Sequence, residues 1–139
     1  MNIVSTMELS ASGLTAQRQR LNVIAENLAN AQVTRTPRGG PYLRKNVVLE
    51  TRPQEDFGSL METPSKVAVT NIVETNEGLT QEYNPSHPDA NEAGMVTWPN
   101  VNPVTEMVSL VQASRAFDAN VAAFRAGKTM ALKALDILR

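Results

Sequence analysis

The longest periodic segment of the sequence is PVTEMVSLVQASRAFDANVAAFRAGKTMALKALDIL, residues 103–138. Its start is typical of a helix, because Asn102 can cap free backbone N–H groups and Pro103 lacks only an N–H that the first turn leaves unused. Steps of three and four residues then connect apolar positions through the rest of the stretch. The spacing predicts one helix on the order of 50 Å long.

The apolar seam of this helix has the periodicity of a coiled coil. Its polar positions include Lys128, whose long side chain we expect to reach solvent rather than to be buried. The ten seam positions are Met107, Leu110, Ser114, Phe117, Val121, Phe124, Lys128, Ala131, Leu135 and Leu138. A helix with a single apolar stripe needs a partner to cover it, so a second helix is expected elsewhere in the chain.

The N-terminal segment predicts that second helix. Ser5 and Glu8 have the spacing of a capping box, in which side chains satisfy the free N–H groups of the first turn. Large apolar residues then recur every seven positions, and the intermediate positions are filled by Ala11, Arg18 and Ala25. The recurring residues are Met7, Leu14, Leu21 and Leu28. This pattern is a second coiled-coil seam, interrupted once at Arg18.

Glycine and proline divide the chain into three parts. All eight prolines and five of the seven glycines lie in residues 36–103. The net charges of 1–35, 36–103 and 104–139 are +1, −4 and +2. We therefore expect helices in 1–35 and 104–139, and a β-rich, turn-rich domain in 36–103 that is solvated rather than continuous with their core. The predicted fold class is α+β, a coiled-coil hairpin of the terminal helices with a small β-rich domain inserted between them.

Within the middle segment, apolar and polar residues follow the pattern of short strands. Residues 66–73 alternate in the manner of a half-buried strand, and 42–50 and 79–83 are weaker candidates. Residues 84–89, NPSHPD, are a turn-rich connector, because each proline excludes helical geometry at the residue before it.

The totals exclude several classes of protein. A length of 139 residues suits one domain, and a net charge of −1 gives no reason to expect nucleic acid as a partner. The absence of cysteine excludes disulfides and thiolate chemistry. The N-terminus has neither the basic region nor the apolar run of a cleavable signal peptide, and no apolar run is long enough to span a bilayer.

No group of residues in the sequence predicts an active site. His87 is the sole histidine and lies between Ser86 and Pro88, without the convergent partners that catalysis or a metal site requires, so we interpret it as structural or solvated. The acidic residues show no paired spacing of the kind that glycosidases use. Gly39-Gly40 precedes a proline and predicts a turn, and Trp98 is interpreted as a buried anchor. We expect no catalytic residue, no metal, no cofactor and no small-molecule substrate.

Two stretches resemble a known family. LTAQRQRLNVIAENLAN, residues 14–30, is similar to the N-terminal signature of flagellar rod and hook axial proteins. Residues 87–101, with Glu106-Met107, 113–120, Lys128 and Met130, resemble the C-type proximal rod subunits of the flagellar basal body within that family.

The resemblance implies a non-enzymatic structural subunit. Such proteins are similar in having two terminal helices with a β-rich domain between them. They leave the cytoplasm by the flagellar type III export apparatus without a cleaved signal peptide. They polymerise helically into the periplasmic drive shaft that transmits torque. The implied partners are further copies, the other proximal and distal rod proteins, the membrane-ring or rod-base proteins and the export apparatus.

On this interpretation the assembly interface comes from the two helices. The expected contact residues are Met7, Leu14, Leu21, Asn27, Leu28, Asn30, Met107, Leu110, Phe117, Asn120, Val121, Phe124, Leu135 and Leu138. Asn27, Asn30 and Asn120 are either solvated helix-surface amides, with Asn30 as a helix cap, or hydrogen-bonding groups that fix the register between helices. The resemblance favours the second interpretation.

Two other functions remain as alternatives. A soluble helical adaptor or export chaperone would share the helical hairpin but would not polymerise. A remote alternative is an enzyme that acts on peptidoglycan. Fractionation with basal bodies and turnover of peptidoglycan by the purified chain distinguish these classes.

Overall fold

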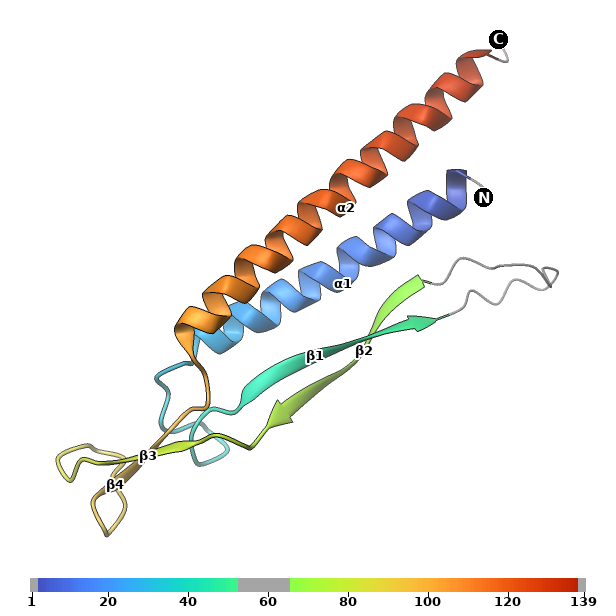
Figure 1. Ribbon diagram of the computed structural model, residues 1–139. Coiled ribbons are helices and arrows are strands. Elements are labelled where there is room, and N and C mark those ends of the chain that lie inside the picture. Colours follow the sequence, from blue (N-terminus) through green and yellow to red (C-terminus); the bar gives the residue numbers. More distant parts are fainter. Residues whose placement is uncertain (1–2, 53–65, 138–139) are drawn as a thin grey trace.

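The computed structural model describes residues 3–52 and 66–137 as two long helices and two small antiparallel sheets. The helices are α1 (Ile3–Ala29) and α2 (Pro103–Ile137). The strands are β1 (Arg44–Arg52), β2 (Lys66–Thr75), β3 (Thr80–Tyr83) and β4 (Met95–Trp98). Figure 1 shows α1 and α2 side by side and antiparallel, so that the start of α1 and the end of α2 lie at the same end of the molecule. The α+β class is confirmed.

Helix α2 begins as its sequence predicts. The Asn102 side-chain oxygen accepts hydrogen bonds from the backbone N–H groups of Val104 at 3.0 Å and Thr105 at 3.4 Å. The Asn102 carbonyl accepts the first helical bond, from the Glu106 N–H, at 3.0 Å. Pro103 follows the cap at the first helical position.

Helix α1 differs from the prediction at both ends. It is already helical at Ile3, so Ser5 lies inside the helix and is not its N-cap. It ends at Ala29 rather than near residue 35, and the chain then turns, with the Val33 N–H donating to the Asn30 carbonyl at 3.1 Å. The capping-box prediction was therefore wrong, because that spacing also occurs by chance inside a helix.

The middle segment forms two separate two-stranded sheets. Strand β1 pairs with β2, and a bulge between Val48 and Leu49 shifts their register. Strand β3 pairs with β4, with Thr80 opposite Trp98 and Tyr83 opposite Met95. The three predicted strands are present, but β4 was not predicted.

The β1–β2 hairpin is not a body separate from the helices. It runs along α1 in Figure 1, and the Val67 N–H donates to the Ser12 hydroxyl of α1 at 3.2 Å. Val23 and Ile24 of α1 are each 6% exposed. The expected independence of the middle was wrong, because α1 uses one face for α2 and another for the hairpin. No helix in the described parts of the chain is long and apolar enough to cross a membrane.

Candidate assembly interface

The contact between the helices is built from small residues that face larger ones. A Cβ added at Gly13 of α1 would lie 3.1 Å from the Asn120 amide nitrogen of α2. A Cβ added at Gly127 of α2 would lie 3.1 Å from Cγ of Met7. Because each glycine accommodates the longer side chain opposite it, the two backbones approach closely along this line.

This contact places half of the predicted α2 seam one residue away from its expected position. The positions turned toward α1 repeat every seven residues at Glu106, Ala113, Asn120 and Gly127, of which Ala113 is 1% exposed. Ser114 and Lys128, at the predicted positions, are exposed. The prediction chose its positions because they are more hydrophobic as a set. The actual contact uses the residues before them, because small side chains allow the two backbones to approach closely. Whether the helices form a regular coiled coil stays a prediction.

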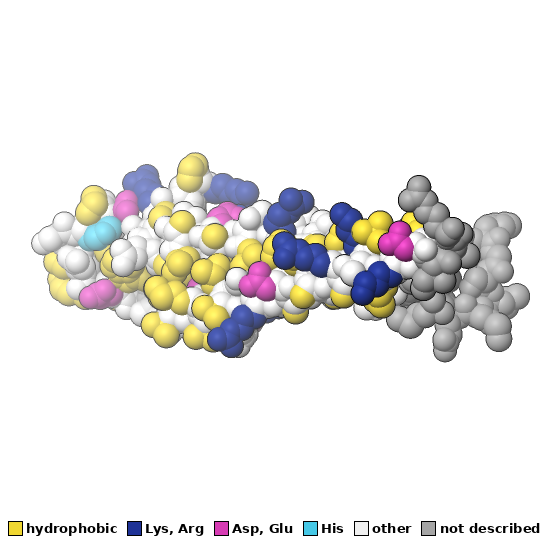
Figure 2. Space-filling model, turned by 90° about the horizontal axis from the view of Figure 1, so that it is seen from above, with side chains coloured by type: hydrophobic (Ala, Val, Ile, Leu, Met, Phe, Trp, Pro, Cys, Tyr) yellow, Lys and Arg dark blue, Asp and Glu magenta, His cyan; other side chains and the backbone are white. Residues whose placement is uncertain are grey.

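The outer side of α2 carries an apolar surface, which we call the outer patch. It begins in the first turn of the helix and repeats every three or four residues. Its members are Val104, Met107, Val108 and Val111, which are 69%, 52%, 53% and 51% exposed. A groove beside it is lined by Leu21 of α1 and by Leu110, Val111, Ser114 and Arg115 of α2. Figure 2, seen from above, shows exposed hydrophobic side chains along the elongated molecule.

A second apolar surface lies at the C-terminal end of α2, which extends past α1 in Figure 1. We call this part, residues 128–137, the overhang. It exposes Met130, Leu132 and Leu135 at 55%, 54% and 63%. Leu135 lies seven residues after Lys128, in the same register as the exposed Met107 and Ser114. None of the described residues covers these side chains, and exposed apolar groups of this kind are typical of an interaction surface.

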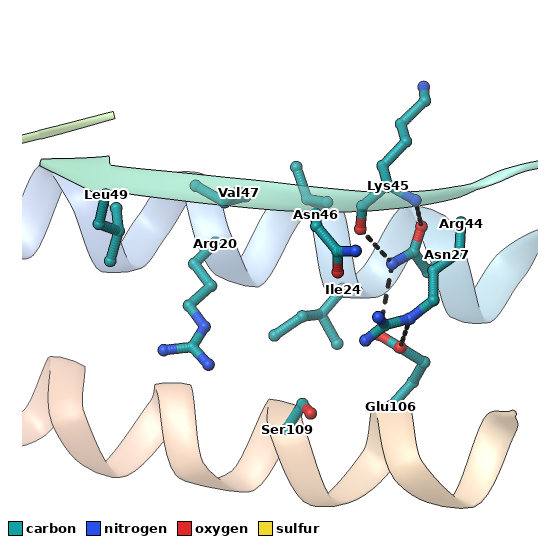
Figure 3. A pocket seen from close by; sticks show the side chains of 11 residues that line it. Arg20, Ile24, Asn27, Arg44, Lys45, Asn46, Val47, Leu49, Glu106 and Ser109 are labelled. Carbon is teal, nitrogen blue, oxygen red and sulfur yellow. Dashed lines mark hydrogen bonds and ion pairs between the residues drawn. The ribbon is translucent and has the colours of Figure 1, made fainter. Parts of the chain in front are cut away.

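At the other end of the helical pair, Asn27 is the centre of a buried polar cluster (Figure 3). The Asn27 side chain is 1% exposed, donates to the Lys45 carbonyl at 2.9 Å and accepts from the Lys45 N–H at 3.0 Å. Its oxygen also accepts the Tyr42 hydroxyl at 2.9 Å. The amide thus pairs with β1 as a neighbouring strand would, and fixes the hairpin to α1.

Glu106 connects this cluster to α2. It is 1% exposed, and its carboxylate receives the Arg44 guanidinium at 2.7 Å and the Asn27 amide at 3.4 Å. A buried carboxylate is tolerated only when it is paired and hydrogen-bonded in this way. Burial, with the carboxylates of Glu26, Glu74 and Glu106 nearby, raises the pKa of Tyr42 to about 12. The cluster therefore holds α1, β1 and α2 in one arrangement.

The predicted contact residues fall into several groups in the structure. Met107 and Leu135 are exposed, Asn27 is buried, and Asn30 donates to the Glu26 carbonyl at 2.8 Å at the end of α1. Leu138 lies outside the described residues. The half-buried members are Met7, Leu14, Leu21, Leu28, Leu110, Phe117, Asn120, Val121 and Phe124.

Sequence reasoning missed several exposed members of the two apolar surfaces. Val104, Val108, Val111, Met130 and Leu132 lie off the predicted seam, and a hydrophobic residue off a seam is easily dismissed as incidental. Their grouping near the two ends of one helix was the sequence feature that could have identified them.

His87 has a structural environment. Its Nδ1 accepts the Asp89 backbone N–H at 3.1 Å, and its ring meets Trp98 edge to face at 6.0 Å between centroids. Asp89 also accepts a hydrogen bond from the Thr34 hydroxyl at 2.7 Å, and this bond joins residues 84–89 to the segment after α1. Trp98 is half-buried in β4, and the described residues hold no group of three metal-ligating side chains.

Comparison with known proteins identifies the family. Residues 7–35 match the family described as flagella basal body rod protein, and residues 92–137 match the C-terminal family of flagellar basal body rod FlgEFG proteins. The chain is 40% identical to the flagellar basal-body rod protein FlgC of Bacillus subtilis over 149 residues, which cover 99% of each chain. The chain belongs to the flagellar basal-body rod protein family.

Other rod proteins are similar over their full length. Identity is 36% with FlgC of Borreliella burgdorferi, covering 100% of this chain and 99% of the relative. It is 37% with FlgC of Escherichia coli O6:H1, covering 99% and 98%. The predicted resemblance to C-type rod subunits is confirmed. The two rod-protein matches include nearly all of both helices and leave out β1, β2 and β3, so the family signature follows the helical pair.

Proposed function

We propose that this chain is a non-enzymatic structural subunit of the proximal flagellar rod, which assembles through the outer patch and the overhang of α2. The observation that carries the proposal is the apolar surface that α2 leaves uncovered in a family of rod proteins. Exposed apolar groups at both ends of one long helix are costly for a monomer and suit a helical polymer, in which neighbours cover them.

The finer parts of the proposal concern place and partners. The chain leaves by the type III export apparatus without a cleaved signal peptide and lies in the basal body. It contacts further copies, other proximal and distal rod proteins and the membrane-ring or rod-base proteins. The rod transmits torque across the periplasm, and α1 and α2 pair as a coiled coil within it. The buried Asn27 cluster supports this role, because it keeps the helices from sliding past the hairpin.

Basal bodies purified from a strain that lacks this gene and carries it on a plasmid test the proposal. We expect the chain to copurify with basal bodies and to restore swimming. A chain found only in the soluble fraction would indicate an adaptor or chaperone instead. Release of peptidoglycan fragments by the purified chain would contradict the non-enzymatic assignment.

A further inference from the structure

A pocket of about 250 Å³ lies between α1, β1 and α2, beside the Asn27 cluster (Figure 3). Val23 and Ile24 of α1 and Val47 and Leu49 of β1 give it apolar walls. Its volume corresponds to roughly eight water molecules and lies below the roughly 300–1,000 Å³ of small-molecule sites. The pocket therefore fits a single side chain better than a cofactor or substrate.

Arg20 gives the pocket an uncompensated positive charge. Its side chain extends from α1 toward α2 in Figure 3 and is half-buried. No hydrogen bond or ion pair within residues 3–52 and 66–137 involves its guanidinium. The pocket's one carboxylate, Glu106, is already bound by Arg44 and Asn27. A partly buried cation without a counter-charge is unfavourable, whereas the guanidinium geometry suits a carboxylate.

We propose that this pocket receives an aspartate or glutamate side chain from a neighbouring rod subunit, with Arg20 as its ion-pair partner. The inference rests on the proposed function, because it takes the neighbour to be a rod protein. The apolar walls accommodate the methylene groups of the incoming side chain, and the Ser109 hydroxyl at the α2 wall offers a further hydrogen bond to its carboxylate. The contact is distinct from the outer patch and the overhang, which bind through apolar area.

Charge reversal in the complemented deletion strain tests the pocket. Arg20→Glu should lower the amount of the chain in purified basal bodies at least tenfold, whereas Arg20→Lys should retain most of it. The matched control is Arg18→Glu, which makes the same change at an exposed position two residues away and should stay within twofold of wild type. Normal incorporation of Arg20→Glu would overturn the inference, while absence of the wild-type chain from basal bodies would overturn the proposed function itself.

A photo-crosslinking residue at position 20 keeps the test decisive if Arg20→Glu fails to fold because of Glu106. In purified basal bodies, crosslinks to an acidic segment of a neighbouring chain are expected. Crosslinks confined to the same chain would refute the proposal that a carboxylate of a neighbouring subunit occupies the pocket. Arg20→Gln, which removes the charge with little change in size, should fold with the urea midpoint of wild type and still lose incorporation. Full incorporation of that variant would also contradict the proposal.

Discussion

At the scale of single residues, Asn27 does what no apolar residue could do at its position. Its amide forms hydrogen bonds with both the carbonyl and the N–H of Lys45 in β1. It also donates a hydrogen bond to Glu106, so that one side chain contacts both β1 and α2. The hydrogen bonds of Asn27 therefore hold α1, β1 and α2 together inside the subunit.

Asn27→Ala should destabilise the monomer by about 2–4 kcal/mol, because it leaves several buried polar groups without partners and each costs roughly 1–3 kcal/mol. Urea unfolding followed by circular dichroism measures the change. Asn30→Ala is the control, since its amide bonds only to its own helix, and it should cost less than about 1 kcal/mol. Equal effects of the two variants would mean that the cluster contributes nothing specific.

The raised pKa of Tyr42 predicts that the folded protein loses stability at high pH. Its pKa of about 12 in the folded chain lies above the ordinary tyrosine value of 10.0, so the unfolded chain releases the phenol proton first. The stabilisation is complete below pH 10 and is lost as the pH rises toward 12, by about 2 kcal/mol. Urea unfolding of Tyr42→Phe should show a smaller decline over this range than wild type. Tyr83→Phe, at a residue 69% exposed, should retain the wild-type decline.

Several residue roles were accessible from the sequence and others were not. Asn102 and Pro103 act as predicted, because capping is a local interaction between neighbours in the chain. The partners of Asn27 were not predictable, since Lys45 and Glu106 reach it only through tertiary contacts. The structure supports register-fixing hydrogen bonds for Asn27 and the helix-end interpretation for Asn30. Asn120 packs against Gly13.

At the scale of elements, the pairing of α1 with α2 depends on Gly127. Gly127→Leu should destabilise the monomer by about 1–2 kcal/mol, because overpacking near Met7 outweighs the gain in helix propensity. The matched control is Ala126→Leu at the exposed neighbouring position, which should leave the urea midpoint nearly unchanged. A Gly127→Leu variant as stable as the control would show that the helices do not need close approach.

The helices were more predictable than their contacts. Long segments of helical periodicity, separated by a region rich in glycine and proline, are enough to predict α1 and α2. The faces through which they pack were harder to assign. The contact positions Ala113, Asn120 and Gly127 are small or polar residues, which do not stand out as an apolar stripe. The packing of the hairpin on α1 had no signal in local pattern at all, since it arises from residues far apart in the chain.

At the scale of the whole molecule, burial is concentrated where three elements meet and is weak at the overhang. Amide exchange on dilute protein should therefore be slow near residues 16–27 and 106–113 and fast in 128–137, where α2 extends beyond α1. The same exchange on purified basal bodies should show new protection in the overhang. Overhang amides that exchange equally fast in both samples would mean that assembly does not cover this part of α2.

The most direct test of the account is the amount of each α2 variant found in purified basal bodies. Met107→Asp and Leu135→Asp place a charge on surfaces that are exposed in the monomer, at 52% and 63%, so the fold should be retained. Ala122→Asp adds the same charge at an exposed position between the two surfaces. The account predicts normal urea unfolding for all three, incorporation reduced at least tenfold for the first two, and near wild-type incorporation for the control. Met107→Asp and Leu135→Asp chains incorporated at wild-type levels, with full swimming, would contradict the claim that α2 assembles the rod through these surfaces.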